Sequence, residues 1–393
     1  MLSFSSVSVA QKAPISDFGE TAARYDSLVV VDYNAKNIVA VKQHLNEVLK
    51  EYNKLSPMLR DKYKEQLSGI YYNAACTYAL AGQKKEAMEC LMRSDYSDYD
   101  HVLEDTDLDT LRNDPMFRAF LNKTKNTRSR YMRILASGGM LDDKIDSLVP
   151  PMTYEPAEDP DLVNLRKAFA LDSVAGKANE RSQIINIMHW VHNTIAHNGS
   201  KDNPGDRNAL NLLNTCIKKG KTCNCRGLAI TLSELYLAMG YRARYATCLP
   251  MDSTDNDCHV ITEVYSNTLR KWVWMDPIFD AYVMDEEGTL LSIAEVRARL
   301  IMNRPLILTP EANWNHKNSQ SKRSYLYNYM AKNLYRIEYP LNSTFNFDSP
   351  GKGKKRTYVQ VKPASYKRGK AMDKNADGNY IVYYTSHIGG VLK

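Results

Sequence analysis

Two cysteines separated by one residue, Cys223 and Cys225, directly precede an apolar helical pattern. Asn224 suits the N-cap of that helix, and Gly240 suits the position just after its last turn. The apolar stripe between them consists of Leu228, Leu232, Leu235 and Met239. Cys225 would then lie in the first turn, where amide N–H groups and the helix dipole lower the pKa of a thiol. This placement favours a cysteine nucleophile.

A histidine and an aspartate follow in strand-like sequence. The expected antiparallel strands are residues 241–249, 258–266 and 270–277. If the second turn is centred between Asn267 and Thr268, His259 lies opposite Asp276. Opposed side chains have Cβ atoms about 4.5–5.5 Å apart, so an imidazole and a carboxylate can hydrogen-bond there. Such a carboxylate fixes the imidazole tautomer and stabilises its protonated form.

These residues resemble the transglutaminase-like superfamily of papain-like cysteine enzymes over roughly residues 180–285. The motifs that carry the resemblance are Cys225-Arg226-Gly227-Leu228-Ala229, then Leu235, Gly240, Ala243 and Arg244, then His259 with Glu263, then Trp274-Met275-Asp276-Pro277. The resemblance implies that Cys225 is the nucleophile, His259 the general base and acid, and Asp276 the orienting acid. It also places the backbone N–H of Cys225 in the oxyanion site.

The sequence departs from the family pattern at two positions. Cys223 stands where a glycine is common, two residues before the nucleophile, and Ile261 stands where an aromatic residue is common, two after the histidine. Neither is a member of the triad. Both could reshape the cleft or the oxyanion site.

Other uses of the cysteines compete with the nucleophile hypothesis. Cys223, Cys225, Cys258 and His259 could bind zinc, but one residue between cysteines is not the usual knuckle spacing and no second knuckle follows. Cys223 could instead form a disulfide with Cys216, Cys248 or Cys258. We therefore expect no metal and no cofactor at the site.

Two further motifs favour structural roles. His189, His192 and His197 lie in or beside a helical pattern at residues 181–197, and we interpret them as surface or cap histidines. Residues 373–378 match the first half of a calcium loop, but Tyr384 occupies the last ligand position, where a bidentate glutamate is needed. A polar turn between strands is the favoured interpretation there.

Composition excludes several classes of protein. The formal charge of +7 depends on residues 351–370, because removal of their eight basic side chains leaves −1. No nucleic-acid motif accompanies this basic segment, so a solvated C-terminal segment is expected. No apolar run reaches the roughly 18 residues of a membrane-spanning helix.

The N-terminal residues resemble the end of a signal peptide. Ser8-Val9-Ala10 before Gln11 has the small residues of a signal-peptidase site, although a basic region is missing, which an upstream start would explain. We expect a secreted or periplasmic protein, with a cytoplasmic one as the alternative. Seven cysteines are compatible with either compartment.

The first third of the chain has a helical pattern. Residues 71–94 combine small residues, aromatic residues and a turn at Gly82 in a spacing that resembles a tetratricopeptide repeat, and residues 107–121 resemble the segment that closes such a unit. One repeat rarely stands alone, so we expect a helical platform that packs on the next domain and could bind a protein partner.

The predicted fold class is α+β: a transglutaminase-like (papain-like) domain, with the cysteine-bearing helix packed on an antiparallel sheet, preceded by a TPR-like α-helical segment. The expected divisions are a leader remnant at 1–20, the TPR-like segment at 21–125, a linker at 126–155, the core at 156–305 and a C-terminal extension with the basic segment at 306–393.

The function expected from these residues is that of a secreted bacterial cysteine hydrolase or acyltransferase. It would form a thioester with an amide or peptide substrate and act as a peptidase or deamidase. The alternative is a non-catalytic module that binds a peptide or glycan on a degenerate transglutaminase fold.

Overall fold

The computed structural model describes residues 18–96, 99–126, 129–349, 351, 354–366 and 371–392. The chain divides into two compact units, residues 1–127 and 128–393. The expected cleavage after Ala10 and parts of the basic segment lie outside the described residues. Over the described part, none of the helices combines the length and the apolar character needed to cross a membrane.

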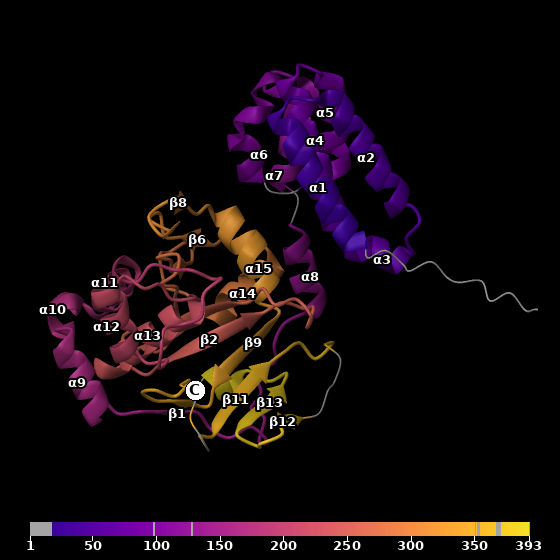
Figure 1. Ribbon diagram of the computed structural model, residues 1–393. Helices are drawn as coiled ribbons and strands as arrows, with labels where there is room; N and C mark the ends of the chain where they lie inside the picture. The colour runs from indigo at the N-terminus through magenta and orange to yellow at the C-terminus, as the bar shows by residue number, and fades with distance from the viewer. Residues whose placement is uncertain are drawn as a thin grey trace, which may run out of the picture. The chain divides into compact units, whose positions relative to one another are not determined.

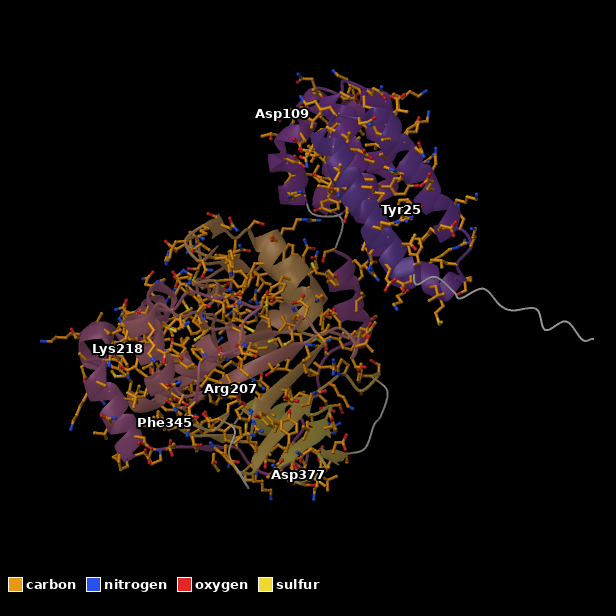
Figure 2. The ribbon with its side chains drawn as sticks, viewed as in Figure 1. Tyr25, Asp109, Arg207, Lys218, Phe345 and Asp377 are labelled. Carbon is orange, nitrogen blue, oxygen red and sulfur yellow. The ribbon has the colours of Figure 1, made fainter. Side chains whose placement is uncertain are left out.

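The first unit is helical (Figure 1). Its elements are α1 (Phe18–Asn34), α2 (Ile38–Tyr52), α3 (Pro57–Lys62), α4 (Lys64–Leu80), α5 (Lys84–Ser94), α6 (Tyr99–Glu104), the 3-10 helix η1 (Thr106–Leu111) and α7 (Pro115–Asn126). Its core lies between these helices, and Tyr25, labelled in Figure 2, belongs to it.

Helices α4 and α5 form the hairpin expected at residues 71–94. Gly82, with φ +75°, makes the turn between them. Ala74, Ala75 and Ala79 on α4 and Ala87 on α5 are fully buried. Small side chains let two helix backbones approach closely, which explains the alanine pattern. The helical character is as expected, and the resemblance to a tetratricopeptide repeat stays a prediction.

The second unit is mixed. Its helices are α8 (Arg130–Gly138), α9 (Pro160–Ala168), α10 (Leu171–Ala175), α11 (Glu180–Thr194), α12 (Ala209–Lys219), α13 (Cys225–Ala238), α14 (Ile293–Met302), the π-helix η2 (Arg323–Met330), α15 (Ala331–Asn333) and α16 (Gly389–Leu392). Its strands are β1 (Thr153–Tyr154), β2 (Ala243–Leu249), β3 (His259–Ser266), β4 (Lys271–Met275), β5 (Val283–Met284), β6 (Ile307–Leu308), β7 (Asn313–Trp314), β8 (Asn318–Ser319), β9 (Arg336–Pro340), β10 (Asn342–Ser343), β11 (Arg356–Val361), β12 (Met372–Lys374) and β13 (Tyr380–Thr385).

A seven-stranded sheet organises the described part of this unit, in the order β12-β13-β11-β9-β2-β3-β4. Strands β11 and β13 are parallel, and every other neighbouring pair is antiparallel. Helix α13 packs on β2 and β3, where Thr262 donates its hydroxyl hydrogen to the carbonyl of Ala229 at 2.9 Å. The predicted α+β class, with the cysteine-bearing helix on an antiparallel-rich sheet, is confirmed.

The two faces of the sheet are covered by different helices. Alternate strand residues such as Val264 and Val273 pack against α13 and its neighbours. The intervening residues, such as Ile261 and Trp274, pack against α8, α14, α15 and η2. This period-two division determines which side chains of β3 and β4 can meet.

The structure divides the chain differently from the expected boundaries. Part of the expected linker, residues 130–138, is helix α8, whose Met132 and Leu135 are buried in the core of the second unit. The expected extension after residue 305 supplies β9, which pairs directly with β2, and then β11 to β13. Apolar residues of these strands, including Ile337 and Val359, complete the same core. Strands β9 and β11 to β13 are therefore part of the central sheet and not a separate C-terminal layer.

Candidate active site

Cys225 is the first residue of α13 and is partly exposed. Asn224 is the N-cap, as expected, and its side chain accepts a hydrogen bond from Gly227 N–H at 3.2 Å. Asn203 in turn holds Asn224 at two points: its side chain donates to Asn224 Oδ1 at 2.7 Å and accepts from Asn224 N–H at 3.0 Å. The helix start that presents the thiol is therefore held from outside the helix.

His259 is the first residue of β3, and its Nε2 lies 2.7 Å from Asp276 Oδ2. Both side chains are buried. Because Nε2 is used by Asp276, Nδ1 is the ring nitrogen left to interact with Cys225. The structure thus brings Cys225, His259 and Asp276 into one chain of polar contacts.

The expected hairpin register was wrong by two residues. Ser266 pairs with Lys271, which makes Ile261, not His259, the position opposite Asp276. The turn is longer than expected because Glu180 accepts hydrogen bonds from the backbone N–H groups of Asn267 and Thr268, both at 2.9 Å. A shift of two residues leaves both side chains on the same sheet face, so the histidine and the aspartate still meet as diagonal neighbours.

Asp276 is held by several donors. Its Oδ2 also accepts the hydroxyl hydrogen of Tyr325, at 2.5 Å, and its Oδ1 accepts from Ile278 N–H at 2.9 Å. Its backbone is bridged to Ala281 in both directions. The carboxylate therefore has a fixed orientation toward the histidine.

The electrostatic environment of Cys225 and His259 favours a thiolate on the cysteine and an imidazolium on the histidine. Burial acts to raise the pKa of Cys225, but the neighbouring ring of His197 and the hydrogen bond and charge of His259 outweigh it and lower that pKa to about 6. Burial acts to lower the pKa of His259, but the charge and hydrogen bond of Asp276, with help from Cys225, raise it to about 10. Opposite charges stabilise each other in this way within a few ångströms.

Two aromatic rings flank His259. Tyr329 lies with its ring centroid 5.2 Å from the imidazole and Phe279 at 5.5 Å. Both are partly exposed, while the imidazole itself is buried. They shield the ion pair from water, which strengthens its electrostatic interactions.

Two other carboxylates, those of Glu263 and Asp280, have partners of their own. Glu263 forms a fully buried ion pair with Arg244 at 2.7 Å, on the far side of Ile261 from His259. Asp280 contacts His189 Nδ1, and His192 Nδ1 lies 3.0 Å from the carbonyl oxygen of Pro277. His189, His192 and His197 were interpreted as surface or cap histidines; His192 lies in the last turn of α11 and is buried, so it is not a surface residue. The contacts of His189 with Asp280 and of His192 with Pro277 connect α11 to the loop after Asp276.

The remaining cysteines near the site are thiols. Of the three expected partners of Cys223, Cys216 is its neighbour, with 3.5 Å between the two sulfur atoms, well beyond the roughly 2.05 Å of a disulfide. Cys223, Cys225, Cys258 and His259 do not gather three ligand atoms within 4.8 Å, so their geometry does not favour a zinc site.

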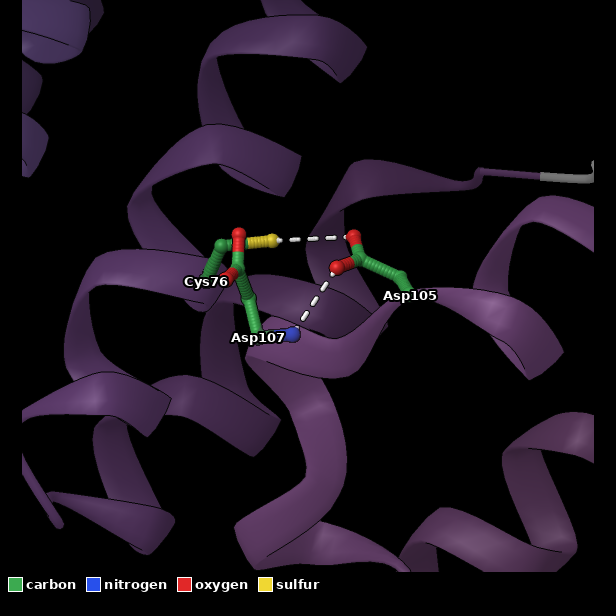
Figure 3. A group of neighbouring side chains, drawn as sticks. All are labelled: Cys76, Asp105 and Asp107. Atoms are coloured by element: carbon green, nitrogen blue, oxygen red, sulfur yellow. Dashed lines mark hydrogen bonds between the residues drawn. The ribbon is translucent and has the colours of Figure 1, made fainter.

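One group in the described residues does bring three potential metal ligands together, but it belongs to the helical unit and not to the candidate active site. Figure 3 shows Cys76, Asp105 and Asp107. The Asp105 carboxylate already accepts from Asp107 N–H at 3.0 Å and from the Tyr72 hydroxyl at 2.6 Å, and Asp107 accepts from the Tyr33 hydroxyl at 2.5 Å. These bonds account for the group as a helix cap tied to two tyrosines.

Residues 373–378, the half calcium loop, comprise the end of β12 and the start of the turn to β13, where Asn375 Oδ1 accepts from Tyr380 N–H at 2.9 Å. Asp377, labelled in Figure 2, lies in this turn. This is the polar turn that the sequence favoured.

Three residues at the site carried no recognisable sequence signal. Tyr325 contacts Asp276 from 49 residues away, and its segment is a π-helix without a clear period. His197 was grouped with the helix before it, but α11 ends at Thr194 and Ile195 is extended. Asn315, which holds the His197 backbone, offered no signal either.

Comparison with known proteins defines the class of the domain. Residues 167–277 match the model of the transglutaminase-like superfamily, so the chain contains a transglutaminase-like domain, and the family supports a cysteine enzyme in general. A crystal structure from Cytophaga hutchinsonii, of a protein assigned provisionally as a cysteine protease, is 19% identical with a TM-score of 0.23. The match covers 32% of this chain and 46% of that one. No curated protein matches the chain.

Proposed function

We propose that the protein is a cysteine hydrolase that cleaves amide bonds in peptides or proteins. The observation that carries the proposal is the contact of His259 with Asp276 at 2.7 Å beside a thiol whose pKa is lowered to about 6. A low thiol pKa together with a histidine oriented by a carboxylate is the arrangement that activates a cysteine nucleophile.

The roles of the three residues follow from their protonation. The Cys225 thiolate attacks the carbonyl carbon of an amide, the C–S bond forms and the C=O electron pair moves onto oxygen. As this intermediate collapses, His259 gives its Nδ1 proton to the amide nitrogen, the C–N bond breaks and the amine leaves. Asp276 keeps the ring in place through Nε2–H.

Water completes the cycle. Neutral His259 takes a proton from a water molecule that attacks the thioester carbonyl, the C–S bond then breaks, and the acid product leaves with the Cys225 thiolate restored. An amine in place of water would give transamidation. We favour hydrolysis because water is abundant and no feature of the described residues is recognised as an acceptor-amine site. Secretion and a protein partner for the helical unit are further parts of the proposal, motivated by residues 8–11 and 71–94.

The test uses a peptide library in isotopically labelled water, with and without a primary amine, and mass spectrometry of the products. Hydrolysis places one labelled oxygen in each new carboxyl group, whereas transamidation places the amine there. Cys225→Ala should form neither product. A wild-type protein that binds peptides but leaves all of them unchanged would support the non-catalytic binding module instead.

A further inference from the structure

A second histidine, His197, lies beside the start of the nucleophile helix. The strand-like segment that contains it runs next to Cys223: Asn198 N–H donates to the Cys223 carbonyl at 2.8 Å, and Cys223 N–H donates to the Ala196 carbonyl at 3.2 Å. The Asn315 side chain holds both the N–H and the carbonyl of His197, at 2.8 and 2.9 Å. The backbone of His197 is therefore fixed close to Cys225.

The ring of His197 is held in one tautomer by Trp314. The indole N–H donates to His197 Nδ1 at 2.9 Å. Because an indole nitrogen is only a donor, Nδ1 must be unprotonated, and the single ring proton of His197 is on Nε2. The ring is thus neutral and presents an N–H group on the side away from Trp314.

That N–H group makes no hydrogen bond that would stabilise the fold. Nε2 of His197 is buried and has no hydrogen-bond partner among the described residues. A buried donor without a partner destabilises the folded protein, so a persistent one calls for an explanation. The ring is close enough to Cys225 to help lower the pKa of its thiol, which places the N–H beside the nucleophile.

His197 cannot duplicate the role of His259. Its Nδ1 is occupied by Trp314 and its Nε2 already carries a proton, so neither nitrogen can accept one from the thiol. What the ring can do is donate. Cys225 offers a second donor, since it is the first residue of α13 and its N–H has no partner within the helix.

We propose that His197 Nε2–H is the side-chain donor of the oxyanion hole and acts together with the Cys225 backbone N–H. This inference rests on the proposed function. When the thiolate attacks, the C=O electron pair moves onto oxygen, and the two N–H groups stabilise that negative charge without themselves transferring a proton. When the intermediate collapses, the C=O bond re-forms and the leaving group departs.

The test compares two reactions of Cys225 that differ in whether an oxyanion forms. Iodoacetamide is attacked at a saturated carbon and forms none, whereas p-nitrophenyl acetate is attacked at a carbonyl. Both rates are measured across pH so that their plateaus compare the fully ionised thiolate. For His197→Ala we expect the acylation plateau to fall by about 10²–10³-fold, which is the usual loss when one oxyanion-hole donor is removed from an enzyme. The alkylation plateau should stay within about tenfold of wild type.

Two variants and one control sharpen the test. His197→Gln keeps an N–H donor and should recover part of the acylation rate. Trp314→Phe removes the bond that fixes the tautomer and should lower acylation without removing the imidazole. The control is His316→Asn. His316 is exposed and lies two residues after Trp314, in the turn between β7 and β8. Its φ is +58°, a conformation that asparagine tolerates.

Equal loss of both reactions in His197→Ala would overturn the inference, because His197 would then act only on the thiolate. Unchanged acylation would overturn it as well. A wild-type Cys225 that reacts with neither reagent would instead overturn the proposed function itself.

Discussion

Tyr325 and His259 share one oxygen atom of Asp276. The tyrosine hydroxyl lies 2.5 Å and the histidine Nε2 2.7 Å from the same Oδ2, and all three side chains are buried. The Asp276 carboxylate is therefore held by the π-helix η2 as well as by the loop that follows β4. This contact connects the C-terminal part of the chain to the candidate active site.

Tyr325→Phe should destabilise the second unit with little change in its shape. It removes a buried hydrogen bond to a charged group, so the free energy of unfolding should fall by about 1.5–3 kcal/mol. Denaturant unfolding measures this, with Tyr327→Phe, a partly buried tyrosine of the same π-helix, as the matched control. If the two variants lost equal stability, the bond to Asp276 would contribute nothing of its own.

Asp276→Asn should harm chemistry far more than Tyr325→Phe does. Loss of the charge destabilises the imidazolium, and the analogous change in serine triads costs about 10⁴ in rate. The amide must also turn its NH₂ group toward either Ile278 N–H or the His259 and Tyr325 donors, so some loss of stability is expected too.

Acylation rates of Asp276→Asn, measured well below its unfolding temperature, separate the two effects. Circular dichroism should remain that of a folded protein. Full activity in this variant would remove Asp276 from the role of orienting acid, and no described carboxylate is placed to replace it, since Glu263 and Asp280 have other partners.

The pH dependence of acylation should differ between amides and activated esters. Cys225 must be deprotonated, so both rates should rise through pH 6, because its pKa is lowered to about 6. An amide leaving group also needs the proton of His259, so only the amide rate should fall again near pH 10, where that proton is lost. Single-turnover rates for both substrates test this. A falling limb of equal size for the ester would exclude His259 as the acid.

Gly227→Ala should disturb the start of α13. A Cβ there would lie 2.3 Å from Asn203 Oδ1 and 3.0 Å from the Cys223 Cβ, so Asn203 must give up its position beside Asn224. We expect lower stability and a higher pKa for Cys225. A double-mutant cycle with Asn203→Ala should show coupling of about 0.5–3 kcal/mol, because the clash with Asn203 disappears once that side chain is truncated, while the contact with Cys223 remains. Strictly additive losses would contradict this explanation.

Periodic features were the predictable part of the molecule. The caps at Asn224 and Gly240 mark α13 because capping chemistry is local, and Gly240 has φ +86° as a residue after a helix end requires. The meeting of His259 with Asp276 survived an incorrect register because side chains alternate with period two. A one-residue error would have placed them on opposite faces.

Contacts across long sequence separations were not predictable. Trp314 reaches His197 from 117 residues away, out of a two-residue strand, and Tyr325 belongs to a π-helix. Neither element has a periodic pattern long enough to identify. The strands after residue 305 were missed as part of the sheet for a related reason, since a strand sequence does not say which neighbour it pairs with.

The central claim is that Cys225 is a thiolate near neutral pH because of the groups around it. The most direct measurement is the rate of iodoacetamide alkylation of each cysteine against pH, followed by mass spectrometry of the separate peptides. Cys258 is the internal reference, because it is also partly exposed and burial raises its pKa. We predict that the Cys225 rate reaches its plateau above about pH 7, while the Cys258 rate still rises about tenfold per pH unit through pH 8. A Cys225 rate that rises in parallel with that of Cys258 through pH 8 would contradict the account.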